Sequence, residues 1–209
     1  DNTDNKKIEI NELLKGKIIS IFPGSRLSEL KSHVPILIEF IKKMNKEQNN
    51  YNYIFHATEG SKEYLSQIIK KNNIENVDLI SNENIKIDTI KKSIFAIVKS
   101  GTVSLEVCKY GVPSIIIYKM NFVNFFIAKL FLKIKFANMI NIINNKEIIP
   151  ELLQNECNSY EIYKTVNYLL KKPEIINEQL KQVNKTINEL RSNTSSSNEA
   201  SSVLLSYLR

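Results

Sequence analysis

The chain has 209 residues, of which 29 are basic and 22 are acidic, so its net charge is +7. A chain of this length buries roughly 70% of its unfolded surface, so it needs no disulfide or structural metal to fold. The two cysteines, Cys108 and Cys157, form no metal or redox motif, and His33 and His56 are isolated in sequence. We therefore expect neither a metal site, nor a cofactor, nor a Cys/His catalytic pair.

The excess of positive charge would attract nucleic acid, phosphorylated ligands or an anionic membrane surface. No RRM, helix-turn-helix or zinc-finger pattern accompanies it, so nucleic acid is not the expected partner. No run approaches the ~20 apolar residues of a membrane span.

Residues 1–15 form a polar lead without the apolar core of a signal peptide, and a short helix is expected near residues 10–14. Because the sequence does not begin with Met, we expect a processed chain or a piece of a longer protein.

Short apolar runs alternate with helical patterns from residue 16 to residue 118. This alternation predicts an α/β fold, a Rossmann-like doubly wound parallel sheet with right-handed crossovers, over residues 16–157. Pro35 should kink or break the first of its helices. The expected strands are 16–22, 51–56, 77–81, 94–98 and 114–118, and the expected helices between them are 27–48, 58–71, 85–92 and 103–110.

Residues 122–132 read as a dense apolar helix interrupted by lysines. It would be buried at a domain or subunit interface, or it would rest on a membrane as a basic-aromatic surface. Residues 138–154 suit a loop, in which Pro150 could open a helix. The last part, residues 158–209, should form C-terminal helices at 158–171, 174–191 and 199–208.

The turn Ser100-Gly101-Thr102 separates an apolar strand from a helix. The first N–H groups of a helix have no partner within it, and the helix dipole favours an anion there. Glu106 lies one turn further on, where a carboxylate could accept two hydrogen bonds from a ribose diol. This reading predicts a nucleotide site. The alternative is that Thr102 caps the helix and Glu106 is a solvated charge.

Two other loops would meet this turn at the carboxyl ends of the strands. In Pro23-Gly24-Ser25-Arg26, glycine permits close approach of a ligand and the guanidinium can bind a phosphate. The other loop lies within residues 141–154. Neither a Walker A motif nor G-x-G-x-x-G is present, which argues against a P-loop NTPase or an ordinary dehydrogenase.

The order of several sequence blocks resembles the lipid-A-disaccharide synthase family. The resemblance covers residues 16 to about 170 and implies the carboxyl-terminal half of a GT-B glycosyltransferase. The blocks are FPGSRLSEL (22–30) with Pro35, SGTVSLE (100–106), GVPSIIIYK (111–119), NII (141–143) and IPELLQ (149–154).

The resemblance implies a reaction in which 2,3-diacylglucosamine passes from its UDP derivative to lipid X, with inversion and without a metal. The products would be a β-1,6-linked disaccharide 1-phosphate and UDP. Arg26 would neutralise diphosphate charge and Glu106 would hold the ribose. The residues that the resemblance assigns to UDP-sugar binding are Gly24, Ser25, Arg26, Ser100, Gly101, Thr102, Glu106, Asn141, Glu151 and Gln154.

Three positions depart from the family pattern. Lys99 stands where a small residue is usual, Met139-Ile140 replaces a Leu-Pro-like pair, and residues 195–197 replace a Gly-rich turn. The family's amino-terminal half, with the acceptor pocket and the general base, has no counterpart in the sequence. We therefore expect a donor-binding half, inactive alone, that needs the amino-terminal half or a second copy, so the catalytic residues stay unassigned.

Several functions remain open at this stage. The chain could belong to another UDP-GlcNAc-type GT-B transferase or epimerase, or it could be a non-catalytic nucleotide-sugar-binding module. It could also be a basic α/β domain that docks on a membrane or partner. In the family reading, we expect a cytoplasmic protein, peripheral on the inner face of the bacterial inner membrane, that handles UDP-diacylglucosamine and lipid X.

Overall fold

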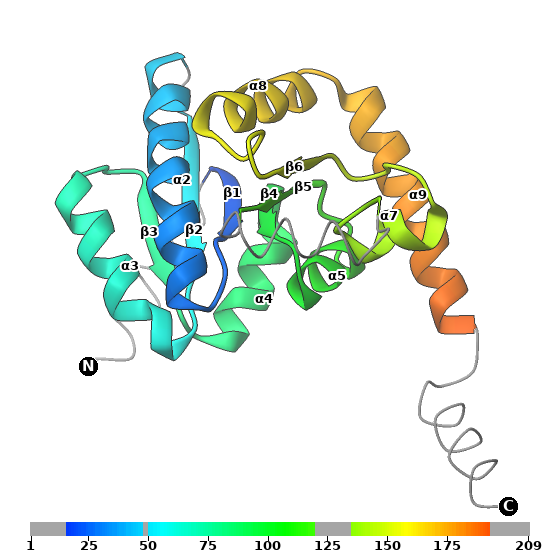
Figure 1. Ribbon diagram of the computed structural model, residues 1–209, viewed down its shortest axis with the longest axis horizontal. Coiled ribbons are helices and arrows are strands. Elements are labelled where there is room, and N and C mark those ends of the chain that lie inside the picture. Colours follow the sequence, from blue (N-terminus) through cyan, green and yellow to red (C-terminus); the bar gives the residue numbers. More distant parts are fainter. Residues whose placement is uncertain (1–15, 48–49, 120–134, 193–209) are drawn as a thin grey trace, which may run out of the picture.

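The computed structural model describes residues 16–47, 50–119 and 135–192. Its centre is a six-stranded sheet in the order β3-β2-β1-β4-β5-β6, and each neighbouring pair of strands is parallel (Figure 1). The order reverses direction between β1 and β4. The strands are β1 (Lys17–Phe22), β2 (Tyr51–His56), β3 (Val77–Ile80), β4 (Ser93–Lys99), β5 (Ser114–Tyr118) and β6 (Glu151–Leu153).

Helices cover both faces of this sheet. Two large apolar clusters, one on each face, hold the helices in place, and a small third cluster of Ile18, Ile54 and Ile80 packs against Ile85 of the helix at residues 83–92. On one face lie α2 (Leu27–Glu47), α3 (Glu59–Asn72) and α8 (Ser159–Leu170), and on the other lie α4 (Glu83–Lys92), α5 (Thr102–Lys109) and α7 (Met139–Asn144).

The last helix, α9 (Pro173–Ser192), contacts both apolar clusters. Ile175 and Ile176 pack against the first cluster, whereas Val183 and Ile187 pack against the second. Its middle is joined to β5 by Gln179, whose amide accepts a hydrogen bond from Ser114 N and donates one to Ser114 O, both 3.0 Å long. The helix therefore runs past the β6 side of the sheet and ties the two faces together.

The strands consist of runs of β-branched and aromatic residues, which are buried on both faces of the sheet, as a parallel sheet requires. In β1, Ile19 and Ile21 belong to the first cluster, while Phe22 belongs to the second. The predicted fold class and the five predicted strands are confirmed, each within about two residues of its expected ends.

The expected break at Pro35 is wrong, because α2 continues through it to Glu47. Proline removes one N–H of the helix and disturbs the carbonyl of the preceding turn. Pro35 lies on the exposed side of α2, where water can satisfy that carbonyl, and the buried neighbours Val34, Leu37 and Ile38 keep the helix against the sheet.

The segment expected to be a loop has two ordered elements. Met139–Asn144 forms α7, and Pro150 precedes strand β6 instead of opening a helix. Ile116 N donates to Pro150 O, so pairing with β5 decides the conformation. The predicted helices at 158–171 and 174–191 are confirmed as α8 and α9. The predictions for residues 1–15, 122–132 and 199–208 lie outside the described residues, and the domain limits stay a prediction.

None of the helices within residues 16–47, 50–119 and 135–192 combines the length and the hydropathy that a membrane span requires.

Gln179 offers a test of how α9 is attached. Gln179→Leu should lower the free energy of unfolding by about 1–3 kcal/mol, because it leaves a buried N–H and C=O of Ser114 without partners. Urea denaturation would measure the change. Gln182→Leu is the matched control, since the Gln182 side chain bonds the exposed side chains of Lys146 and Glu178. Equal losses in the two variants would contradict this account.

Candidate functional site

A cavity of about 440 Å³ opens at the carboxyl ends of the strands. It lies between β1 and β4, where the crossover connections leave in opposite directions. Doubly wound sheets bind their ligands at such a point. The lining residues come from the loops after four strands and from the first turns of α2, α3, α4 and α5.

The β1 side of the cavity is shaped by the start of α2. Glu29 Oε2 accepts hydrogen bonds from Ser25 N at 3.2 Å and from Arg26 N at 3.4 Å, which is the back-bonding of a capping box. Gly24 adopts a φ of 114°, and a Cβ there would lie 2.5 Å from Glu29 Oε2. Glycine is therefore required at this position for the glutamate to reach the backbone.

The β4 side is shaped by the start of α5. Its N-cap residue is Gly101, which has no side chain to bond the first amides of the helix. In α4, by contrast, Asn82 Oδ1 accepts from Asn84 N and Ile85 N. Thr102 is the first residue of α5 and not its cap. The amino-terminal end of α5 therefore faces the cavity without a capping side chain, and it can take an anion.

Glu106 lies one turn inside α5 and forms a salt bridge to Lys86 of α4, with Oε2 2.8 Å from Nζ. Lys86 also bonds Glu83 at 2.7 Å and lines the cavity. Burial alone would lower the pKa of Lys86, but the two carboxylates raise it above its ordinary value. Glu106 is thus a fixed carboxylate beside the cavity and not a freely solvated charge.

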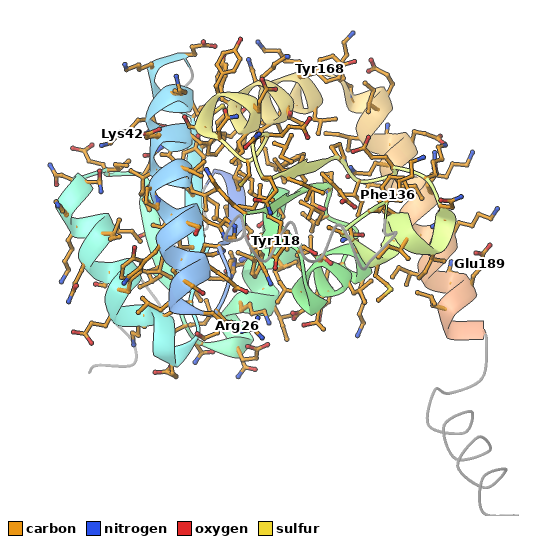
Figure 2. All side chains as sticks on the ribbon, in the orientation of Figure 1. Arg26, Lys42, Tyr118, Phe136, Tyr168 and Glu189 are labelled. Carbon is orange, nitrogen blue, oxygen red and sulfur yellow. The ribbon has the colours of Figure 1, made fainter. Side chains whose placement is uncertain are left out.

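Lys99 and Arg26 carry the positive charge nearest the loop that follows β1. Lys99 lines the cavity, and its Nζ lies 3.1 Å from Glu29 Oε1. Arg26 is bonded to the same oxygen at 3.5 Å but does not line the cavity, and Figure 2 shows it at the amino-terminal end of α2. Burial would raise the pKa of Glu29, but Lys99 and the Arg26 and Ser25 amides hold it below its ordinary value.

His33 joins two loops at the carboxyl edge of the sheet. Its Nδ1 donates to Pro23 O at 2.8 Å, and its Nε2 accepts from Lys119 N at 3.0 Å. These partners fix a neutral ring, and burial lowers its pKa. Both ring nitrogens are occupied, so His33 holds the loops after β1 and β5 together and is not free to transfer a proton.

His56 lines the cavity at the end of β2 and stacks on Phe22, with ring centroids 4.1 Å apart. A chain of hydroxyls fixes its tautomer: Ser93 Oγ donates to Thr89 O, so Ser20 must donate to Ser93, and His56 Nε2–H must donate to Ser20. Burial, with a smaller effect of Lys86, lowers the pKa of His56 to about 3. It too is a neutral structural histidine.

Asn141 and Glu151 form a buried network behind the α5 turn. Asn141 donates to Ile149 O and to Glu151 Oε1, and its Oδ1 accepts from two backbone amides. Glu151 accepts from Ala137 N and Asn138 N. These bonds use the full hydrogen-bonding capacity of the Asn141 amide in this structure.

This network reaches the cavity through Ser100, and it also contacts Ser104 in the first turn of α5. Ser100 Oγ donates to Ala137 O at 2.7 Å, and Asn138 Nδ2 donates to Ser104 Oγ at 2.9 Å. Asn141 and Glu151 thereby position the turn before α5 from behind.

The predicted site residues fall into two groups. Glu106 does not line the cavity but bonds Lys86, which does, and Arg26 lies outside the lining. Gln154 directly follows β6, and its Nε2 is buried and has no hydrogen-bond partner among the described residues. A binding role for every one of the predicted site residues stays a prediction. Those that line the cavity are Gly24, Ser25, Ser100, Gly101 and Thr102.

Sequence reasoning gave no binding role to Glu29, His56, Lys86 or Lys99, although they line the cavity. The position of Glu29 could have been predicted, because an acidic residue in the first turn of a helix is typical of a capping box. Lys86 had none, because its place depends on how α4 packs beside α5. Among the described residues, no group of three His, Cys, Asp or Glu side chains could hold a metal ion.

Solved structures of low sequence identity share this fold. UDP-GlcNAc 2-epimerase from Neisseria meningitidis, bound to UDP-GlcNAc, is similar with a TM-score of 0.57 and 12% identity, covering 90% of this chain and 50% of that one. The C-terminal domain of a group 1 family glycosyl transferase from Francisella tularensis gives 0.55 and 13%, covering 83% and 85%. The chain thus has the Rossmann-like domain of the GT-B glycosyltransferase type.

Sequence comparison identifies the family within this class. A family model described as lipid-A-disaccharide synthetase matches residues 2–205. The lipid-A-disaccharide synthase of Sulfurihydrogenibium sp. (strain YO3AOP1) is 33% identical over 184 residues, which are 82% of this chain and 47% of that protein. The chain belongs to the lipid-A-disaccharide synthase family. It spans about half the length of the curated relatives it matches.

The buried neutral His56 predicts a loss of stability in acid. Its folded pKa of about 3 lies below the ordinary 6.5, so the unfolded chain binds the proton first and stability falls as pH drops below 6.5. Between pH 6.5 and 4.5 this histidine should remove about 2 kcal/mol from the free energy of unfolding.

Denaturant titrations of the wild type and His56→Phe at both pH values would measure this loss. The variant keeps an aromatic ring against Phe22 but cannot titrate, so it should lose less stability over the same range. His33 is present in both proteins, and its contribution cancels in the comparison. Parallel stability curves would refute the assignment of the loss to His56.

Proposed function

We propose that this chain is the donor-binding half of a lipid-A-disaccharide synthase. In this proposal the cavity between β1 and β4 holds the UDP part of UDP-2,3-diacylglucosamine, and the sugar is transferred to lipid X with inversion. The observation that carries the proposal is the uncapped start of α5 at the cavity with Glu106 one turn behind it, in a chain of this family.

The two features supply complementary interactions with a nucleotide. Backbone amides at a helix start and the positive end of its dipole favour a phosphate. The salt bridge to Lys86 orients the carboxylate of Glu106. A carboxylate can accept hydrogen bonds from both hydroxyl groups of a ribose. Charge develops on UDP as it leaves, and preorganised donors at this place would stabilise it without a metal.

Activation of the acceptor hydroxyl requires a base, and neither histidine of the described residues is suited to it. His33 has both nitrogens bonded to backbone groups, and burial lowers the pKa of His56 to about 3, which makes its ring a weak base. An inverting transfer needs a base within hydrogen-bond reach of the attacking hydroxyl. We therefore assign the base, the acceptor pocket and the contact with the acyl chains to the family's amino-terminal half. The complete enzyme would meet its lipid substrates at the cytoplasmic face of the inner membrane.

Calorimetric titration of the chain with UDP, and with ADP as the control, tests the donor site directly. Selective binding of UDP is the expected result, because the cavity would recognise the whole nucleotide and not the diphosphate alone. A correctly folded chain that binds UDP and ADP equally, or neither, would refute a UDP-selective donor site in this half. Addition of the amino-terminal half of a family member should then restore transfer from UDP-diacylglucosamine to lipid X.

Glu106→Ala should weaken UDP binding by about 1.5–3 kcal/mol, the range for hydrogen bonds to a charged group. The control is Glu161→Ala, because Glu161 also forms a salt bridge, to Lys164, with a side chain of similar exposure, but does not line the cavity. Dissociation constants for UDP and for 2′-deoxy-UDP would locate the loss: Glu106→Ala should reduce the preference for the ribonucleotide. An unchanged UDP constant would exclude the ribose role.

A further inference from the structure

A group of three charged residues lies beside the cavity at the start of α2. The carboxylate of Glu29 is 3.1 Å from Lys99 Nζ and 3.5 Å from Arg26 Nη1. The same carboxylate accepts from the Ser25 and Arg26 amides. Two backbone amides and two cationic side chains thus surround the carboxylate of Glu29. Amides and cations are also the donor types that bind phosphate.

The two cations differ in how firmly they are held. The Arg26 side chain is 80% exposed, and its guanidinium pairs with Glu29, only three residues away in the chain. The Lys99 side chain is 19% exposed, and its Nζ lies 5.2 Å from the centre of the Tyr118 ring on the neighbouring strand. A charge held between a carboxylate and an aromatic face loses little conformational entropy when it binds a further partner.

The position of Lys99 also directs it toward an anion at α5. It is the last residue of β4 and immediately precedes the Ser100-Gly101-Thr102 turn, and both line the cavity. An ammonium group has three donor hydrogens, of which the bond to Glu29 uses one. Within residues 16–47, 50–119 and 135–192 this ammonium group has no other hydrogen-bond acceptor, so its other hydrogens can bind a ligand between the two helix starts.

We propose that Lys99, and not Arg26, is the principal side-chain cation for the diphosphate of the nucleotide, with Glu29 holding it in place. This inference rests on the proposed function, since it assigns a residue within the same cavity. It also explains why a lysine can stand at a position where the family usually has a small residue: the extra charge is compensated by Glu29 until a phosphate arrives.

Calorimetric titrations of Lys99→Met with UDP and with uridine test the assignment. UDP binding should weaken at least about tenfold, uridine binding less than about twofold, and Lys99→Arg should keep most of the UDP affinity. The control is Lys91→Met, because Lys91 also rests over a tyrosine, Tyr110, but does not line the cavity. Arg26→Ala should weaken UDP less than Lys99→Met does.

A double-mutant cycle with Glu29→Gln separates phosphate binding from mere neutralisation of Glu29. Glutamine keeps an acceptor for the Ser25 and Arg26 amides but carries no charge. Lys99→Met should still weaken UDP binding in this background. If the loss vanishes there, if UDP and uridine weaken equally, or if Arg26→Ala has the larger effect, the proposal for Lys99 is wrong while the donor site stands. A folded wild-type chain that binds no UDP would refute both proposals.

Discussion

Parallel pairing of β1 and β4 is the constraint on which the rest of the molecule depends. Side-by-side parallel strands bring their carboxyl ends to one edge, and the helices that follow them must leave over opposite faces of the sheet. Here α2 leaves over one face and α5 over the other. The two helix starts therefore border one cavity, although about 75 residues separate them along the chain.

The polar groups at this edge are arranged around that geometry. Glu29 caps α2 from within, and the Asn141–Glu151 network holds residues 137–138 against the turn before α5. His33 joins the loops after β1 and β5 through its two ring nitrogens. Each of these side chains forms hydrogen bonds that hold backbone groups in place. The backbone amides at the start of α5 keep their freedom to meet a ligand, because a glycine stands at the N-cap.

Much of this could be predicted from the sequence, because local patterns decide it. Apolar runs of β-branched residues located the strands, and Gly-containing turns located the loops that line the cavity. Non-local packing decides the rest. Pro35 is tolerated within α2 because the carbonyl of the preceding turn, which loses its N–H partner, lies on the exposed side of the helix. Strand β6 forms because it can pair with β5. Lys86 reaches Glu106 only through the packing of α4 beside α5, which no motif encodes. The sequence motif indicated Arg26 as the phosphate-binding cation, yet the side chain of Lys99 is much less exposed to solvent than that of Arg26.

The course of α9 has a consequence for cooperativity. A sheet with separate apolar layers could in principle lose one layer while it keeps the other. In this chain a single helix contributes Ile175 to one layer and Val183 to the other, and Gln179 between them is bonded to β5. Detachment of α9 would open both layers at once and leave the buried backbone groups of Ser114 in β5 without their partner. The two apolar layers are therefore expected to unfold together, because α9 connects them into a single cooperative folding unit.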